Sequence, residues 1–267
     1  MALFLGVDLG AVSCDAVLLD EALNILAFSV VPTGARHLEA CKKATSEVLG
    51  KAKTTMKEVA CLVTTGYGRD LWEDKAFSAT EITCHAKGIR YFFPDTEILI
   101  DIGGQDSKVI RIGNNGKVID FAMNDRCAAG TGRFLEVMAR ALDLEVSMLQ
   151  TIDEKARQDL SLTTMCTVFA ETEVVGMVAQ GIDVPDIVRA IHKAIALRTK
   201  GLVRRVAKDV SSLKVSMSGG VARNKAVVRA LSEMLSCKIR VPDHPDIVGA
   251  LGAALLGLES YRLERLG

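Results

Sequence analysis

The chain has 267 residues, of which 49% are hydrophobic, so it is long enough to bury the core of one large domain or of two small ones. Its formal net charge is +0 and only 4% of its residues are aromatic, which excludes a general polyanion binder and leaves too few rings to stack nucleic-acid bases. The longest uncharged apolar run, near 247–258, is too short to span a bilayer, so neither nucleic acid nor a membrane is expected as a partner.

A duplication opens the chain. Residues 6–31 align without a gap on residues 99–124, so that Asp8 falls on Asp101 and Gly10 on Gly103. Each copy reads as three strands, the first ending in Asp-x-Gly and the last two joined by a turn. The predicted elements that follow the copies are helices at about 34–52 and 80–92 with a strand near 59–64 between them, and then helices at about 130–142, 168–180 and 186–207.

The chain closes with a strand, a Gly-Gly turn and a helix within "KVSMSGGVARNKAVVRAL", then a short strand at 238–241 and a helix at 246–263. Strands mixed with long helices predict an α/β fold, and the duplication predicts two similar lobes facing each other across a nucleotide cleft. We expect the first lobe to comprise residues 1–94 and 247–267, and the second to comprise residues 95–246, with the crossover near Pro94.

The two Asp-x-Gly turns suit a nucleotide phosphate. A glycine lets backbone N–H groups approach phosphate oxygens, and the aspartate before it holds Mg²⁺ directly or through water. Asp8 and Asp101 are therefore the predicted catalytic residues, which position the metal and the attacking water. The residues predicted to bind the phosphates and nucleoside of ATP or ADP are Gly10, Gly103, Gly104, Gln105, Gly219, Gly220 and Asn224. The alternative interpretation is that these glycines only form hairpin turns.

These turns resemble the phosphate-1, phosphate-2 and adenosine motifs of the acetate and sugar kinase, Hsp70 and actin superfamily, in the forms "GVDLG", "LIDIGGQD" and "VSMSGGVARN". No Walker A sequence is present, which disfavours a P-loop fold. Within the superfamily the chain is similar to ATP-dependent activators of 2-hydroxyacyl-CoA dehydratases, grouped with the ATPase subunits of benzoyl-CoA reductases. The stretches that carry this resemblance are "TTGYGR" (64–69), "IDIGGQDSKVI" (100–110), "MNDRCAAGTGRFLEVMA" (123–139), "TMCTVFAETEVV" (164–175) and "GALGAALLG" (249–257), and it covers nearly the whole chain.

The resemblance implies an ATPase coupled to one-electron transfer, in which a homodimer holds one [4Fe–4S] cluster at its interface. Cys127 and Cys166 are the implied ligands, and since such a cluster usually needs four thiolates, two chains must supply them. Both cysteines precede helix patterns, whose positive dipole ends favour an anionic cluster. Gly130, Thr131 and Gly132 are also predicted to bind cofactor, and their turn is expected to link the nucleotide to Cys127. Ferredoxin or flavodoxin is the implied electron donor, and an iron–sulfur dehydratase or reductase is the implied acceptor.

The other five cysteines, of seven in all, are interpreted as buried small hydrophobic residues: Cys14, Cys41, Cys61, Cys84 and Cys237. Their spacing favours a reducing compartment over a disulfide framework, and the N-terminal stretch lacks the basic segment of a signal peptide, so we expect a cytoplasmic protein. His85, next to Cys84, is interpreted as helix packing. The remaining histidines, His37, His192 and His244, are assigned no chemistry.

The first phosphate loop departs from the family pattern Asp-x-Gly-Ser-Thr-x-x-Lys. Ala11 and Val12 replace the two hydroxyl residues, and Asp15 stands at the lysine position, while Lys108 occupies the matching place in the second copy. A lysine near the phosphates neutralises developing charge, so Asp15 is expected to weaken ATP binding or hydrolysis. Two alternative functions remain open at this point, a sugar-type kinase of the same superfamily and a regulatory subunit with a degenerate ATP site.

Overall fold

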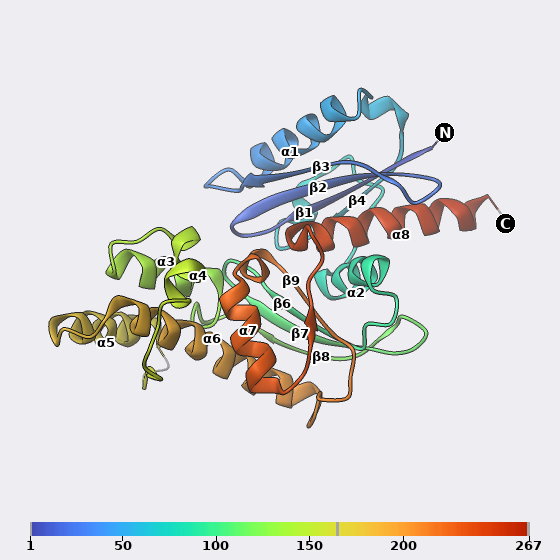
Figure 1. Ribbon diagram of the computed structural model, residues 1–267. Helices are drawn as coiled ribbons and strands as arrows, with labels where there is room; N and C mark the ends of the chain where they lie inside the picture. The colour runs from blue at the N-terminus through green and yellow to red at the C-terminus, as the bar shows by residue number, and fades with distance from the viewer. Residues whose placement is uncertain (1, 164–165, 266–267) are drawn as a thin grey trace. The chain divides into compact units, whose positions relative to one another are not determined.

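The computed structural model describes residues 2–163 and 166–265 and falls into two compact units. Unit 1 comprises Met1–Thr96, Ile112–Ile119 and Pro242–Gly267, and unit 2 comprises Glu97–Arg111 and Asp120–Val241. Figure 1 labels the α-helices and most of the strands of both. Within the described ranges, no helix combines the length and the apolar character needed to cross a membrane.

Unit 1 is built on a five-stranded mixed sheet in the order β3-β2-β1-β4-β5. The strands are β1 (Leu3–Leu9), β2 (Ser13–Asp20), β3 (Ile25–Pro32), β4 (Val59–Thr65) and β5 (Phe77–Ser78). Every residue of β1 is buried, because α1 (His37–Lys51) packs on one face of the sheet and α8 (Val248–Glu264) on the other (Figure 1). A strand covered on both faces reads as a continuous apolar run, as "LFLGV" does.

Unit 2 repeats this arrangement with the order β8-β7-β6-β9-β10. Its strands are β6 (Ile98–Ile102), β7 (Ser107–Ile112), β8 (Val118–Asn124), β9 (Val215–Ser218) and β10 (Ile239–Arg240). Its helices are α3 (Gly132–Ala141), α4 (Leu149–Asp153), α5 (Thr167–Ala179), α6 (Val184–Val206) and α7 (Lys225–Leu235). The repeated strand order confirms the predicted duplication.

The units divide the chain at slightly different points from the predicted lobes. The turn between β7 and β8 belongs to unit 1, where the Arg90 guanidinium donates to the carbonyl oxygens of Gly113 (3.0 Å) and Asn114 (3.3 Å). Residues 242–246 also belong to unit 1, since the His244 ring lies 4.4 Å from that of Phe28. Such contacts join residues far apart in sequence, so a linear pattern does not reveal them.

The longer predicted helices and strands are confirmed, but several short elements were missed. They are β5, α4 and the 3₁₀ turns Met56–Glu58, Arg69–Leu71, Val146–Met148, Gly220–Arg223 and Pro245–Ile247. None of them is long enough to show a hydrophobic period, so tertiary packing rather than local pattern determines them.

The helices α2 (Glu81–Phe92) and α8 cross at backbone contact distance. A Cβ atom built on Gly252 would lie 1.8 Å from the Cys84 carbonyl oxygen, and one on Gly88 would lie 2.0 Å from that of Val248. No side chain fits at either position. The glycines of the "GALGAALLG" stretch therefore have a packing role in unit 1.

Candidate functional site

Asp8 is the last residue but one of β1, and its buried carboxylate fits between two glycines from distant parts of the sequence. A Cβ on Gly66, whose φ is +88°, would lie 2.5 Å from Asp8 Oδ1, and one on Gly249 would lie 2.1 Å from Oδ2. Any side chain at either position would displace the carboxylate. The stretches "TTGYGR" and "GALGAALLG" thus converge on the first predicted catalytic aspartate.

His85 is a second neighbour of Asp8 that sequence reasoning did not assign to the site. Its ring is buried on α2, and Nε2 lies 3.8 Å from Asp8 Oδ2. We interpreted His85 as helix packing, and the structure adds the proximity to Asp8. The two residues are 77 positions apart, and no sequence pattern would bring them together, because the distance depends on how α2 packs against the sheet.

Asp101 occupies the equivalent position at the end of β6 in unit 2 and is 2% exposed. Its Oδ1 accepts a hydrogen bond from Ser218 Oγ (2.7 Å), and its Oδ2 lies 3.6 Å from Lys108 Nζ. Lys108 also lies 2.5 Å from Asp106 Oδ2. Gly219 has a φ of +83°, and a Cβ there would lie 3.0 Å from Asp101 Oδ1. The third predicted turn therefore lies against the second predicted catalytic aspartate.

The turn that follows Cys127 is hydrogen-bonded to the second phosphate turn. The Gly132 N–H donates to the Gly103 carbonyl oxygen (2.9 Å), and the Arg133 N–H donates to that of Gly104 (2.8 Å). Thr131, which precedes these donors, is 0% exposed, whereas Gly103, Gly104 and Gly132 are half-buried and Arg133 is exposed. Within unit 2, backbone contacts thus join the predicted phosphate turn to the segment that carries Cys127.

The other residues predicted to bind cofactor differ in how they are held and in how exposed they are. The carbonyl oxygen of Gly10 accepts a hydrogen bond from Thr33 Oγ1 (2.9 Å), which fixes the first turn. Gly130 has a φ of +86° and packs against Arg198, while Gln105 and Gly220 are exposed.

Asn224 caps α7. Its Oδ1 accepts hydrogen bonds from the N–H groups of Ala226 (3.0 Å) and Val227 (3.2 Å), and its Nδ2 lies 3.0 Å from His192 Nε2. His192, to which no chemistry was assigned from the sequence, therefore has a polar partner. Nothing in the local sequence marks this contact, because the two residues are 32 positions apart.

Cys127 and Cys166 are exposed, and Cys166 is the N-cap residue of α5. Residues 164 and 165, the first two of the quoted "TMCTVFAETEVV" stretch, lie outside the described residues. Burial raises the pKa of the Cys84 thiol to about 12, and it also raises the thiol pKa of Cys61 and Cys237. Burial therefore disfavours the thiolate form at these three positions, and the thiolate is the form that binds a metal.

The prediction of an unpaired thiol is wrong for two cysteines. Cys14 on β2 and Cys41 on α1 are fully buried, as expected, but they form a disulfide with a Cα–Cα distance of 5.4 Å. Strand and helix place the two side chains together in the core of unit 1. The 27-residue separation gave no hint of the pairing.

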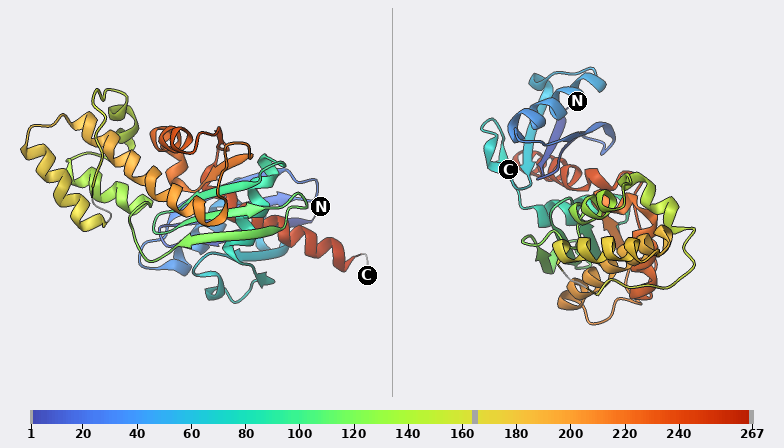
Figure 2. Two further views of the ribbon diagram at one scale, coloured as in Figure 1. Left: turned by 90° about the horizontal axis from the view of Figure 1, so that it is seen from below. Right: turned by 90° about the vertical axis from the view of Figure 1, so that its left-hand side faces the viewer.

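Within residues 2–163 and 166–265, no group of three or more His, Cys, Asp and Glu side chains is placed to hold a metal ion. The two exposed thiols fit a cluster that takes two ligands from each of two chains. The surface of α5 is consistent with a second chain, since four apolar side chains of this helix are 44–66% exposed: Val168, Phe169, Val175 and Val178. Figure 2 shows α5 at the end of unit 2 away from its sheet.

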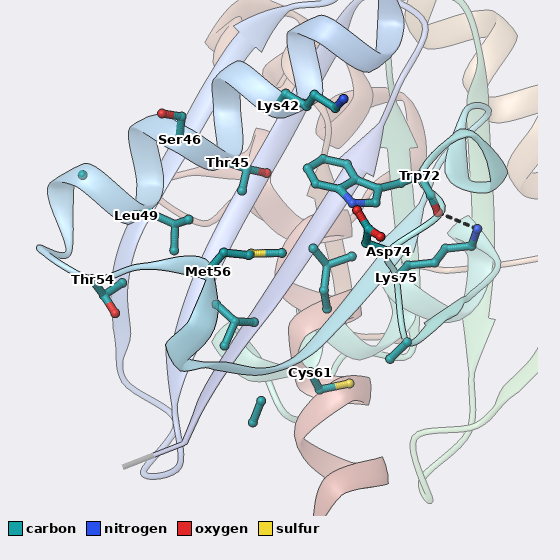
Figure 3. Close-up of a pocket in the computed structure, with 15 residues that line it drawn as sticks. Lys42, Thr45, Ser46, Leu49, Thr54, Met56, Cys61, Trp72, Asp74 and Lys75 are labelled. Atoms are coloured by element: carbon teal, nitrogen blue, oxygen red, sulfur yellow. Dashed lines mark hydrogen bonds between the residues drawn. The ribbon is translucent and has the colours of Figure 1, made fainter.

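A separate cavity of about 790 Å³ lies in unit 1 between α1 and β4 (Figure 3). Thr45 and Leu49 of α1 line it together with Met56 and Trp72, whose carbonyl oxygen accepts a hydrogen bond from Lys75 Nζ (2.7 Å). None of the site residues predicted from the sequence lines this cavity.

Comparison with known proteins agrees with this arrangement. The 2-hydroxyisocaproyl-CoA dehydratase activator of Clostridioides difficile is 38% identical over 97% of this chain and 96% of its own length. The (R)-2-hydroxyglutaryl-CoA dehydratase activating ATPase of Acidaminococcus fermentans is 41% identical over 94% of this chain and 95% of its own length. A solved structure of the Clostridium difficile activator with bound ADPNP superposes with a TM-score of 0.92 at 37% identity, covering 98% of this chain and 97% of the other. Residues 5–257 match one family of ATPases. The chain therefore belongs to the BadF/BadG/BcrA/BcrD ATPase family, and it has the actin-like ATPase fold of two mixed α/β sheets.

Proposed function

We propose that this chain is an ATP-driven activator of a 2-hydroxyacyl-CoA dehydratase or a related reductase. It accepts single electrons from a low-potential ferredoxin or flavodoxin and delivers them to the partner enzyme. The observation that carries the proposal is a pair of backbone hydrogen bonds to the Gly103–Gly104 turn. Their donors are Gly132, which lies five residues after Cys127, and Arg133. If that turn binds the phosphates of ATP, hydrolysis to ADP would move the turn, and the two hydrogen bonds would transmit the movement to the segment that carries Cys127, a proposed cluster ligand.

In the proposed ATP site, Asp8 holds Mg²⁺ and Asp101 orients the attacking water. Ser218 fixes one oxygen of Asp101, and Lys108 neutralises part of the charge beside the other. Gly10, Gly103 and Gly104 present backbone N–H groups to phosphate, since their lack of a side chain permits close approach. Gly219 leaves room for the nucleoside.

Cys127 and Cys166 are the proposed ligands of a [4Fe–4S] cluster that two copies of the chain share. The proposed location of the protein is the cytoplasm. When bound, the cluster supplies a one-electron carrier at the dimer interface. The exposed apolar side chains of α5, which begins at Cys166, support a second copy as the partner. Burial of these side chains between two copies would exclude water from the two thiolates.

The test is reconstitution under anaerobic conditions with a reduced ferredoxin and a purified 2-hydroxyacyl-CoA dehydratase. Dehydration should require ATP and should fail with the non-hydrolysable analogue ADPNP. Asp101→Asn should bind ATP, because the turn glycines remain, but should lower turnover by about 10²-fold or more, since the water is no longer oriented. Dehydratase activation by Asp101→Asn at the wild-type rate would contradict the proposal, and phosphorylation of a sugar would favour the kinase alternative.

A further inference from the structure

His192 lies within α6, is 0% exposed, and forms the centre of a chain of hydrogen bonds in unit 2. Its Nδ1 lies 2.6 Å from Oδ2 of Asp153, the last residue of α4. Its Nε2 lies 3.0 Å from Nδ2 of Asn224, the N-cap residue of α7. Both α4 and α7 pack against α6 (Figure 1). The imidazole therefore joins three helices through polar atoms.

The cap of α7 determines which tautomer His192 adopts. Asn224 Oδ1 accepts from two backbone N–H groups, so the other end of the amide, Nδ2, must face the imidazole. An amide NH₂ group only donates, so Nε2 of His192 must be the acceptor. The single proton of the neutral ring then lies on Nδ1 and is donated to Asp153.

Asp153 is suited to receive that proton because it stays ionised. Burial by itself would raise the pKa of this carboxyl, but its hydrogen bond and electrostatic interaction with His192, together with the nearby positive charges of Arg229 and Arg189, outweigh burial and hold the pKa below its usual value. The carboxylate is 1% exposed, and its Oδ1 contacts both guanidinium groups. Arg189 also donates to the backbone carbonyl oxygen of Asp153 (2.8 Å), which fixes the end of α4.

We propose that His192, as a neutral imidazole held by Asp153, is a positioning residue for the nucleoside part of the ATP site. It fixes the amide of Asn224, and with it the start of α7 and the Gly219–Gly220 turn that leads there. A second contact also fixes the start of α7 against α4, because the Lys225 N–H donates to the Gln150 side chain of α4 (3.3 Å). The inference rests on the proposed function, which assigns the Gly219–Gly220 turn to the nucleoside.

Protonation of His192 breaks this arrangement. The new N–H on Nε2 would face the NH₂ group of Asn224, and turning the amide around would sacrifice both cap hydrogen bonds. Asp153 of α4 contacts the ring and favours the proton, whereas Arg189 of α6 and Arg229 of α7, which contact the other oxygen of the same carboxylate, oppose it. Loss of an N-cap is a modest change, so ADP affinity should fall about fivefold as His192 gains a proton.

The first test is the tautomer itself. The chain has four histidines, so ¹⁵N-histidine labelling of the full-length protein and two-bond ¹H–¹⁵N spectra resolve each ring. His192, identified by its absence in His192→Gln, should carry its proton on Nδ1 with Nε2 unprotonated at neutral pH. A proton on Nε2, alone or with one on Nδ1, would overturn the inference without bearing on ATP binding.

The second test is Asn224→Asp, which keeps an N-cap acceptor but replaces the donor facing His192 by a carboxylate. His192 should then be held as an imidazolium, and the pH dependence of ADP binding should reverse. Calorimetry should show wild-type affinity falling toward acid pH, and the variant's affinity falling as pH rises. His37→Gln, in unit 1, is the control and should follow the wild type.

Identical pH profiles for Asn224→Asp and the wild type would overturn the positioning role. Failure of the wild type to bind ADP at any pH would instead overturn the proposed function and the nucleoside role with it. The tautomer measurement decides separately whether the hydrogen-bond chain exists, so the two failures are distinguishable.

Discussion

Asp8 and Asp15 stand directly opposite each other on β1 and β2, and both are buried. The same two register positions in unit 2 hold Asp101 and Lys108, which form an ion pair. Side chains of directly opposed residues lie on the same face of a sheet, so the two units carry opposite charge beside their aspartates. Ser13 Oγ donates to Asp15 Oδ2 (3.1 Å), which stabilises the carboxylate in this position.

Asp15→Lys should therefore raise the affinity for ATP, because it recreates in unit 1 the Asp–Lys pair of unit 2. Two unit charges about 5 Å apart interact by about 3 kcal/mol at an effective dielectric of 20, and solvent screening reduces this to a change of about tenfold in affinity, on the order of 1.4 kcal/mol. Calorimetry with and without Mg²⁺ measures the ATP affinity of both proteins. ATP binding by the wild type should depend more steeply on Mg²⁺ than ATP binding by Asp15→Lys. Lys108→Asp is the matched control and should weaken binding. Equal ATP affinity in Asp15→Lys and the wild type would show that this position does not act on the nucleotide.

The contact between α2 and α8 depends on glycine at the scale of whole elements. Gly252→Ala would place a methyl group within 1.8 Å of the Cys84 carbonyl oxygen, so the two helices must separate. We expect a loss of at least about 1–3 kcal/mol in the free energy of unfolding, as for other overpacked cores. Urea denaturation measures the change.

Gly50→Ala is the matched control for this substitution. Gly50 is exposed on α1, and a Cβ there meets nothing within 4 Å, so alanine should stabilise the protein by up to about 1 kcal/mol. Equal unfolding free energies for the Gly252→Ala and Gly50→Ala proteins would show that α2 and α8 are not held at backbone contact.

Elements with a clear period were predictable from the sequence, and those determined by long-range packing were not. The first strand of each duplicated copy follows from a continuous apolar run that ends in an Asp-x-Gly turn, and the closing helix follows from its long apolar stretch. In contrast, α4 spans five residues without a period, and its last residue, Asp153, is 39 positions from His192. The Cys14–Cys41 disulfide likewise depends on how α1 docks on β2. The turns around Asp8 and Asp101 were found because each aspartate and its glycine are neighbours in sequence.

At the scale of the whole molecule, the proposed function requires two copies of the chain. Each copy offers two exposed thiols, Cys127 and Cys166, and an α5 surface with exposed apolar side chains beside one of them. Four thiolates are the usual ligand set of a [4Fe–4S] cluster, so cluster content and oligomeric state must change together. A monomer with a complete cluster, or an iron-free dimer, does not fit this ligand set.

The most direct test is iron and acid-labile sulfide per chain, measured on anaerobically purified protein together with its mass in solution. We predict a dimer with about four iron and four sulfide ions in total, which Cys127→Ser and Cys166→Ser each lose. Cys237→Ser, which changes a buried thiol, should retain them. A full complement of iron and sulfide in the Cys166→Ser protein, or in a monomeric wild type, would contradict the proposal that two chains share one cluster.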